Sequence, residues 1–139
     1  MYVGGFLYRG MGCGVWGMEK KSLSNYRDLE AWQVSMDLVD AIYDLTSELP
    51  NREKYNIISQ VERAAVSIPC NIAEGYGRIH RGDYVHHLSI AQGSLREVET
   101  LLIICVRRKY LSREKIKTAW KLSESTGKLL TKLLQSLRD

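Results

Sequence analysis

The stretch that decides the fold reads Gln60-Val61-Glu62-Arg63-Ala64-Ala65-Val66-Ser67-Ile68-Pro69-Cys70-Asn71-Ile72-Ala73-Glu74-Gly75. Apolar residues recur in it at alternating steps of three and four, which places them on one helical face. A polar row runs beside this face, about 130° round the helix. The polar row consists of Gln60, Arg63, Ser67, Asn71 and Glu74. It is either a solvated face or a set of hydrogen bonds between helices or subunits. In the second case every group must be paired, because a buried unpaired group costs about 1–3 kcal/mol.

Pro69 lies inside this helical pattern. Because proline has no N–H and its ring meets the preceding turn, it frees the carbonyl of Ala65 and bends the helix. The residues around it are small enough to let a second helix approach closely. These small residues are Ala64, Ala65, Ser67, Ala73 and Gly75. We therefore predict a bent helix, from Asn51 as N-cap to Glu74, packed against another helix or subunit.

Three further segments have helical periodicity. The first helix should run over about 26–49. Its predicted inner stripe is Leu29, Trp32, Met36, Val39, Tyr43 and Thr46, widened by Ile42, Leu45 and Leu49. The third helix alternates without a break from Tyr84 to Cys105, and the fourth covers about 113–137 after Ser112 as N-cap. With short links, these helices predict an all-α, up-down-up-down antiparallel four-helix bundle over residues 22–139.

Residues 1–21 differ from the rest of the chain. Six of the eleven glycines lie there and interrupt its apolar residues, so the segment fits neither a signal peptide nor a membrane span. We predict a disordered tail, and our hypothesis is that translation begins at Met18. The intact mass of the natively expressed protein tests this, since a mass that includes residues 1–17 contradicts it.

The chain carries no evident catalytic or metal-binding constellation. A carboxylate-bridged di-metal bundle needs two Glu-x-x-His pairs, and the nearest match is one Asp-x-x-His. Glu97 and Glu99 point about 160° apart on a helix, so they cannot act as an acid pair. Cys70 and Cys105 are predicted to be buried free thiols, which fits a reducing cytoplasm. We expect no enzymatic activity, metal, cofactor, small-molecule substrate or membrane segment.

Positive charge is concentrated between Arg107 and Lys121. This segment holds seven basic residues and one acidic residue, a net charge of +6, whereas the whole chain carries +4. Such a cluster is either a solvated face or a surface that binds phosphates through counterion release. We find no RNA-recognition motif and no interleaved aromatic residues, so sequence-specific readout is not expected. The candidate nucleic-acid-binding residues are Arg107, Arg108, Lys109, Arg113, Lys117 and Lys121.

Three stretches together resemble a known family. They are Tyr26-Arg27-Asp28-Leu29-Glu30-Ala31-Trp32-Gln33, the stretch 60–75, and Ile90-Ala91-Gln92-Gly93-Ser94-Leu95-Arg96-Glu97-Val98-Glu99-Thr100. They are similar to bacterial four-helix-bundle proteins first noticed as open reading frames inside intervening sequences of large-subunit ribosomal RNA genes. The resemblance covers roughly residues 23–137. Its middle stretch is the most specific, and residues 1–17 have no counterpart.

The resemblance implies a homopentamer without known enzymatic activity. It also implies a fold related to the accessory protein of diversity-generating retroelements, a basic pentamer that binds nucleic acid and reverse transcriptase. By resemblance, eleven residues have structural roles in helix packing or subunit contacts. These are Gln60, Arg63, Ser67, Pro69, Asn71, Glu74, Gly75, Gly93, Ser94, Glu97 and Glu99.

Two functions remain open at this point. The leading hypothesis is a non-enzymatic oligomeric bundle that associates with RNA through its basic end. The alternative is an oligomeric scaffold that recruits a protein partner and binds no nucleic acid. The two differ in salt dependence, because phosphate binding weakens steeply between low and physiological salt.

Overall fold

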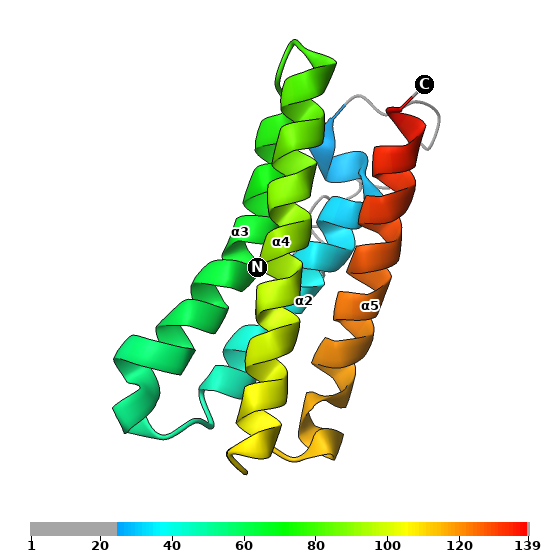
Figure 1. Ribbon diagram of the computed structural model, residues 1–139. Helices are drawn as coiled ribbons and strands as arrows, with labels where there is room; N and C mark the ends of the chain where they lie inside the picture. Colours follow the sequence, from blue (N-terminus) through cyan, green and yellow to red (C-terminus); the bar gives the residue numbers. More distant parts are fainter. Residues whose placement is uncertain (1–24, 139) are drawn as a thin grey trace.

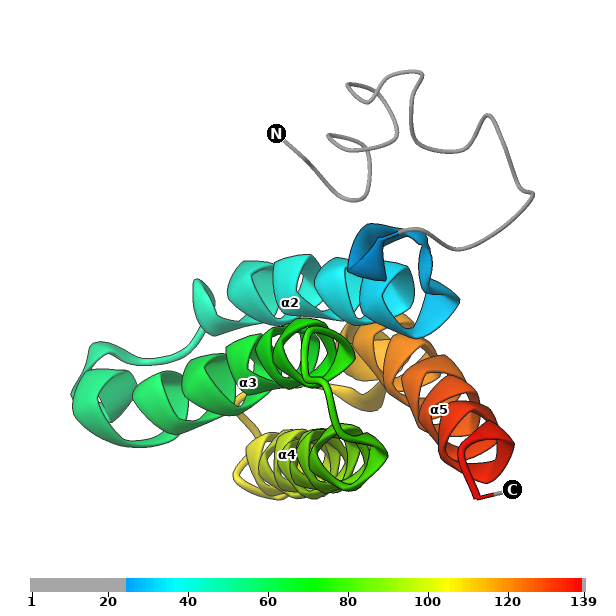
Figure 2. The same ribbon diagram turned by 90° about the horizontal axis from the view of Figure 1, so that it is seen from above.

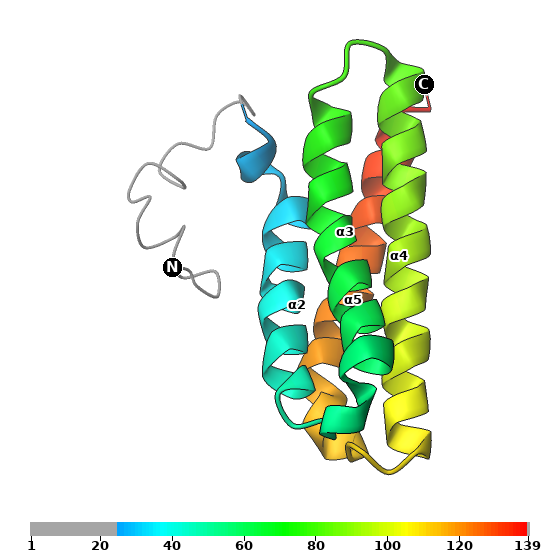
Figure 3. The ribbon, with the colours of Figure 1, turned by 90° about the vertical axis from the view of Figure 1, so that its left-hand side faces the viewer.

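The computed structural model describes residues 25–138, and this part of the chain forms four long helices without a strand (Figure 1). The helices are α2 (Glu30–Thr46), α3 (Ser59–Tyr76), α4 (Arg81–Arg107) and α5 (Arg113–Ser136). The predicted all-α four-helix bundle is confirmed. In Figures 1 and 3 the chain passes along the bundle and turns back at each link. The predictions for residues 1–21 and Met18 lie outside the described residues.

The four helices form a closed ring of neighbours. α3 packs against α2 and α4, and α5 packs against α4 and α2. Seen from above, α3 lies between α2 and α4, while α5 covers the remaining side (Figure 2). Each helix therefore turns one face to a common core and leaves another face available for other contacts.

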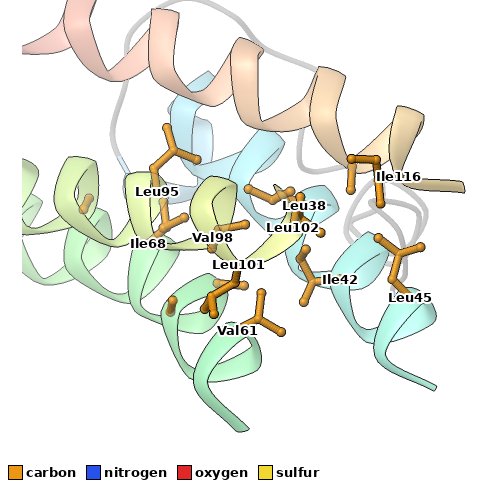
Figure 4. Packing of buried hydrophobic residues seen from close by; sticks show 14 of the residues in the cluster. Leu38, Ile42, Leu45, Val61, Ile68, Leu95, Val98, Leu101, Leu102 and Ile116 are labelled. Atoms are coloured by element: carbon orange, nitrogen blue, oxygen red, sulfur yellow. The ribbon is translucent and has the colours of Figure 1, made fainter. Parts of the chain in front are cut away.

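The core is built from one apolar row on each helix. The unbroken alternation of α4 is buried from Leu88 to Cys105, as its periodicity predicted. In α5 the core row includes the fully buried Ser123 and Thr126, whose hydroxyls donate to the carbonyls of Trp120 and Leu122 at 2.8 Å. Figure 4 shows these rows meeting. Its labelled residues are Leu38, Ile42, Leu45, Val61, Ile68, Leu95, Val98, Leu101, Leu102 and Ile116.

The buried face of α2 differs from the predicted one. Leu38 and Ile42 are fully buried, whereas Tyr43 is 47% exposed and Met36 and Val39 are half-buried. The predicted stripe is therefore confirmed at Leu29, Trp32 and Thr46, which are buried, and wrong in its middle. The fully buried residues there are Ile42, which we placed at the margin, and Leu38, which the prediction did not include. The physical reason is that α3 and α5 both pack on α2, and the face between them is the one that loses contact with water.

The start of α3 also differs from the prediction. Asn51 is not an N-cap: it begins a 3-10 turn, η3 (Asn51–Glu53), which leads into a π-helical turn, η4 (Lys54–Ile58). Regular α-helix begins only at Ser59. In this looser entry Ile57 is buried in the core while Glu53 accepts a hydrogen bond from Tyr110 across the end of the bundle. Tertiary contacts thus outweigh the local capping signal.

Candidate nucleic-acid interface

A tight helix end places the basic residues of α4 and α5 next to each other. α4 ends in a Schellman motif, in which Tyr110 N–H donates to the carbonyl of Cys105 and Lys109 N–H to that of Val106, both at 2.9 Å. Lys109 has the left-handed backbone that this motif requires, with φ 64°. α5 then begins at once, because Ser112 Oγ accepts from the Lys115 N–H at 3.1 Å.

The link between α4 and α5 is braced by polar contacts with the α2–α3 link. Tyr110 Oη donates to Glu53 Oε2 at 2.8 Å, and Arg52 Nη2 donates to Tyr110 Oη at 3.1 Å. The Tyr110 hydrogen bond is the main reason that the pKa of Glu53 lies below its ordinary value. Lys115 adds an ion pair with Glu48 at 3.1 Å. These contacts connect the two links that meet at the basic end of the bundle.

A groove of about 680 Å³ lies between α4 and α5 next to this link, and we call it the α4–α5 groove. Ile103 is 47% exposed there. The apolar residues that line the groove are Ile103, Val106, Ile116 and Trp120. The charged residues that line it are Arg107, Arg113, Lys117, Lys121 and Glu124. The groove therefore combines an apolar lining with four cations and one anion.

The four cations of the α4–α5 groove have no ion-pair or hydrogen-bond partner within residues 25–138. Two other basic residues of α4 and α5 are paired instead. Lys115 contacts Glu48, and Arg96 contacts Glu99 at 2.8 Å. Because the positive charge of the groove is not neutralised from within the described chain, it is available to an anionic ligand without breaking an existing ion pair.

The structure brings four of the six candidate nucleic-acid-binding residues to one groove. Arg107 comes from α4, and Arg113, Lys117 and Lys121 come from α5. Arg108 and Lys109 are exposed on the link and do not line the groove.

Sequence reasoning missed Trp120. It lies three residues after Lys117 and directly before Lys121, so an aromatic residue is in fact interleaved with the basic ones. The position of Trp120 between two lysines could have shown this from the sequence. The expectation that no aromatic residue is interleaved with the basic ones is therefore wrong, because Trp120 lines the groove together with them.

The middle of the polar row connects α3 to α4. Ser94 Oγ donates to Ser67 Oγ at 2.9 Å. Asn71 Nδ2 donates to the same oxygen at 3.0 Å and to the Ser67 carbonyl at 2.9 Å. Since the amide nitrogen of Asn71 is a donor there, its Oδ1 accepts from His87 Nδ1, also at 2.9 Å. These four side chains are half-buried and form one chain of hydrogen bonds.

The two ends of the polar row are exposed, and their partners lie on the same helix or its extension. Gln60 donates to Asn56 at 2.8 Å, Arg63 lies 3.5 Å from Ser59, and Glu74 pairs with Arg78 at 2.9 Å. The ends of the polar row are therefore a solvated face, whereas its middle forms hydrogen bonds between helices. Pro69 is buried within α3, which continues to Tyr76.

α3 and α4 approach each other closely at Gly75. A Cβ atom there would lie 2.8 Å from the Cβ of His87 and 3.0 Å from the ring of Tyr84. Tyr84 is packed edge-on against Tyr76, and its burial raises the pKa of Tyr84 to about 12. Gly93 is different, since a Cβ there would meet nothing within 4 Å in the described chain.

The two glutamates of α4 face different surroundings. Glu97 is exposed, whereas Glu99 accepts a hydrogen bond from Arg96 at 2.8 Å, and its Oε2 lies 3.2 Å from the Ser123 Oγ of α5. They do not meet, which agrees with the expectation that they form no acid pair. Within residues 25–138 no group of three or more His, Cys, Asp or Glu side chains is arranged to hold a metal ion.

Cys70 is exposed, so the prediction of a buried thiol is wrong for it. The inward positions of this turn belong to Ile68, Pro69 and Ile72. Cys105 is buried as predicted, and burial raises the pKa of its thiol.

Cys70 lines an apolar groove of about 350 Å³ that we call the α2–α3 groove. The lining residues are Tyr26, Trp32, Met36, Val39, Val66, Pro69, Cys70 and Ala73. None of the described helices is both long and apolar enough to cross a membrane.

Comparison with known proteins places this arrangement in a family. No curated protein matches the chain. A crystal structure of a protein of unknown function from the S23 ribosomal protein family of Bacteroides thetaiotaomicron is similar, with 27% identity and a TM-score of 0.70 over 76% of this chain and 95% of that one. The model of the 23S rRNA-intervening sequence protein family matches residues 27–132. The chain therefore belongs to the 23S rRNA-intervening sequence protein family.

Proposed function

We propose that this protein is a non-enzymatic, RNA-associated four-helix bundle that binds phosphates along the α4–α5 groove. The observation that carries the proposal is the set of four unpaired cations that line one groove from two helices. Lys and Arg side chains bind nucleic acid mainly by neutralising phosphates and releasing their counterions. RNA is chosen over other polyanions because the family is named for an intervening sequence of ribosomal RNA.

The proposal predicts how strongly the affinity for RNA should depend on salt concentration. On a single strand, each neutralised phosphate contributes about −0.7 to the slope of log K against log salt. Four contacts predict a slope of about −3, so raising salt from about 50 to 200 mM should weaken binding about 50-fold. Fluorescence anisotropy of a labelled RNA measures this. A wild-type protein that binds no RNA at low salt contradicts the proposal.

A matched pair of variants tests whether the groove is the binding surface. The double variant Lys117→Glu/Lys121→Glu reverses two cations of the groove. The control Lys128→Glu/Lys132→Glu makes the same charge change at exposed positions of α5 outside it. We expect the groove variant to lose at least about tenfold more affinity than the control, since long-range effects of exposed charges are screened. Equal losses would show that overall charge, rather than the groove, governs binding.

The protein is further proposed to act as an oligomer, a homopentamer by resemblance, with the α2–α3 groove in the subunit contact. Val66 of this groove is 36% exposed although it is apolar, and Tyr43 on the same helix pair is 47% exposed. Burial of such a surface against a second copy is favourable at about 25 cal/mol per Å². The same surface supports the alternative function, a scaffold that recruits a protein partner. An oligomer that forms but binds no RNA would support this alternative.

A further inference from the structure

We propose that Trp120 makes the α4–α5 groove a site for an unpaired RNA strand, with the indole ring stacking on a base while the surrounding cations hold the neighbouring phosphates. This inference rests on the proposed function and goes further, because it names the form of RNA and the residue that selects it. A phosphate-binding surface alone does not distinguish paired from unpaired RNA.

Trp120 is the described aromatic side chain best placed for such a contact. It is half-buried against the core and lines the groove. Its ring has no hydrogen-bond, ring or cation partner within residues 25–138. Trp32, in contrast, packs edge-on against Tyr26 with 5.5 Å between ring centroids. The single hydrogen bond of Trp120 outside the helix ladder uses its backbone carbonyl, which accepts from Ser123 at 2.8 Å, and leaves the indole unengaged.

The cations around Trp120 suit a strand that crosses the groove. Lys117 and Lys121 lie on either side of it in sequence, four residues apart, or about 6 Å along the helix axis. Arg107 and Arg113 line the same groove at the adjacent ends of α4 and α5. A nucleotide whose base rests on Trp120 thus has cations near its phosphates on both sides.

The apolar lining supports a base rather than a purely ionic ligand. Ile103, Val106 and Ile116 lie beside Trp120, and the groove volume of about 680 Å³ exceeds what a single base needs. Sites that bind single strands without reading their sequence combine a positive groove with aromatic rings, because every base has a π-face. An acidic peptide would match the cations but has no base to place on the ring.

Pairing removes the contact that we assign to Trp120. In an RNA duplex the base faces are stacked inside the helix, and a protein reaches mainly phosphates and 2′-hydroxyls. Trp120 should therefore contribute to binding of an unpaired strand and not to binding of a duplex. This difference separates the inference from the proposed function on which it rests.

The experiment uses the full chain and fluorescence anisotropy at low salt. The probes are a labelled 12-residue uridine oligonucleotide, the same strand paired with its complement, its deoxy counterpart, and a 12-residue abasic ribose-phosphate strand of equal charge. We expect the wild type to bind the uridine strand more tightly than the other three. Trp120→Ala should weaken binding of the uridine strand between about fivefold and a hundredfold. It should leave binding of the duplex and the abasic strand unchanged.

The design keeps the outcomes distinct. Trp120→Phe retains an aromatic face and should recover most of the affinity, and the abasic probe tests stacking on the wild-type protein without any substitution. Salt-sensitive binding that is equal for uridine and abasic strands overturns the role of Trp120 and leaves the proposed function standing. If the deoxy strand binds as tightly as the uridine strand, the assignment to RNA is wrong. If a glutamate 12-mer displaces the uridine strand, the assignment to a nucleic acid is wrong. An absence of RNA binding at low salt overturns both proposals.

Discussion

Lys109 shows how one residue controls the geometry of the basic end. Within residues 25–138 it is the only residue other than glycine with positive φ, and the Schellman motif that it completes turns the chain from α4 towards α5. The left-handed conformation costs an L-residue about 1–2 kcal/mol. Lys109 therefore adopts a backbone conformation that is unfavourable for lysine, and its side chain adds a positive charge to the link.

We predict that Lys109→Gly stabilises the fold. Glycine adopts φ 64° without strain but loses more backbone entropy on folding, so the net gain should be about 0.5–1 kcal/mol in the free energy of unfolding. Urea unfolding followed by circular dichroism measures it. The control Lys109→Ala removes the same charge and keeps the Cβ, so it should not gain stability. Equal gains in both variants would attribute the effect to charge.

Two glycines provide a second prediction at this scale. Gly75→Ala should lower the free energy of unfolding by about 1–3 kcal/mol, because its Cβ would lie 2.8 Å from the Cβ of His87 and the helices would have to separate. Gly93→Ala is the control on the facing helix: it meets open space and should gain up to about 1 kcal/mol from helix propensity. The same denaturation series measures both. If Gly75→Ala were as stable as the wild type, the close approach of α3 to α4 would be wrong.

At the scale of elements, the links decide how the helices are aligned. The irregular entry to α3 brings Glu53 to Tyr110, and that hydrogen bond at 2.8 Å joins the α2–α3 link to the α4–α5 link. Capping signals near Asn51 could not reveal this, because the partner lies 57 residues away along the chain. The links matter for the groove as well, since its two helices meet there.

The Glu53–Tyr110 contact should make stability depend on pH. The pKa of Glu53 is lowered from 4.5, mainly by the Tyr110 hydrogen bond, so its stabilising contribution is present above the unfolded pKa. It is lost as pH falls through the lower, folded pKa. We expect Tyr110→Phe to melt at a lower temperature than the wild type at pH 7, and this difference to narrow by pH 3. A difference in melting temperature that is equal at both pH values would exclude Glu53 as the cause.

At the scale of the whole molecule, the two grooves lie on different faces of the bundle. The α4–α5 groove carries charge and one aromatic ring, whereas the α2–α3 groove is apolar. α2 and α4 flank α3 on opposite sides in Figure 2, so the two grooves are formed by different pairs of helices. Assembly and RNA binding can therefore be tested with separate substitutions.

If the α2–α3 groove forms the proposed subunit contact, we predict that Val66→Asp dissociates the proposed oligomer. A carboxylate in an apolar subunit contact is strongly unfavourable, while at a position that is 36% exposed in the single chain it should leave the bundle folded. Light scattering should then give the monomer mass of 15.9 kDa. The control Ile79→Asp places the same charge at a residue that is 91% exposed in the α3–α4 link, and should not change the mass. An unchanged mass for Val66→Asp would exclude this groove from the contact.

Local periodicity by itself determined the four helices and the buried row of α4. Residue types along the chain determined the Ser112 cap and the clustering of charge between Arg107 and Lys121. These features depend on residues within one or two helical turns, so the chain encodes them locally. The family resemblance could be recognised from the sequence for the same reason, because each of the three stretches that carry it is contiguous.

Only the tertiary structure decided which face of α2 is buried, that Cys70 is exposed, and which part of the polar row is paired with α4. It also brought Trp120 into one groove with Arg107. Each of these depends on which neighbouring helix removes a side chain from water or supplies its partner. That information lies in residues far apart in sequence, and only the packing of the four helices brings them together.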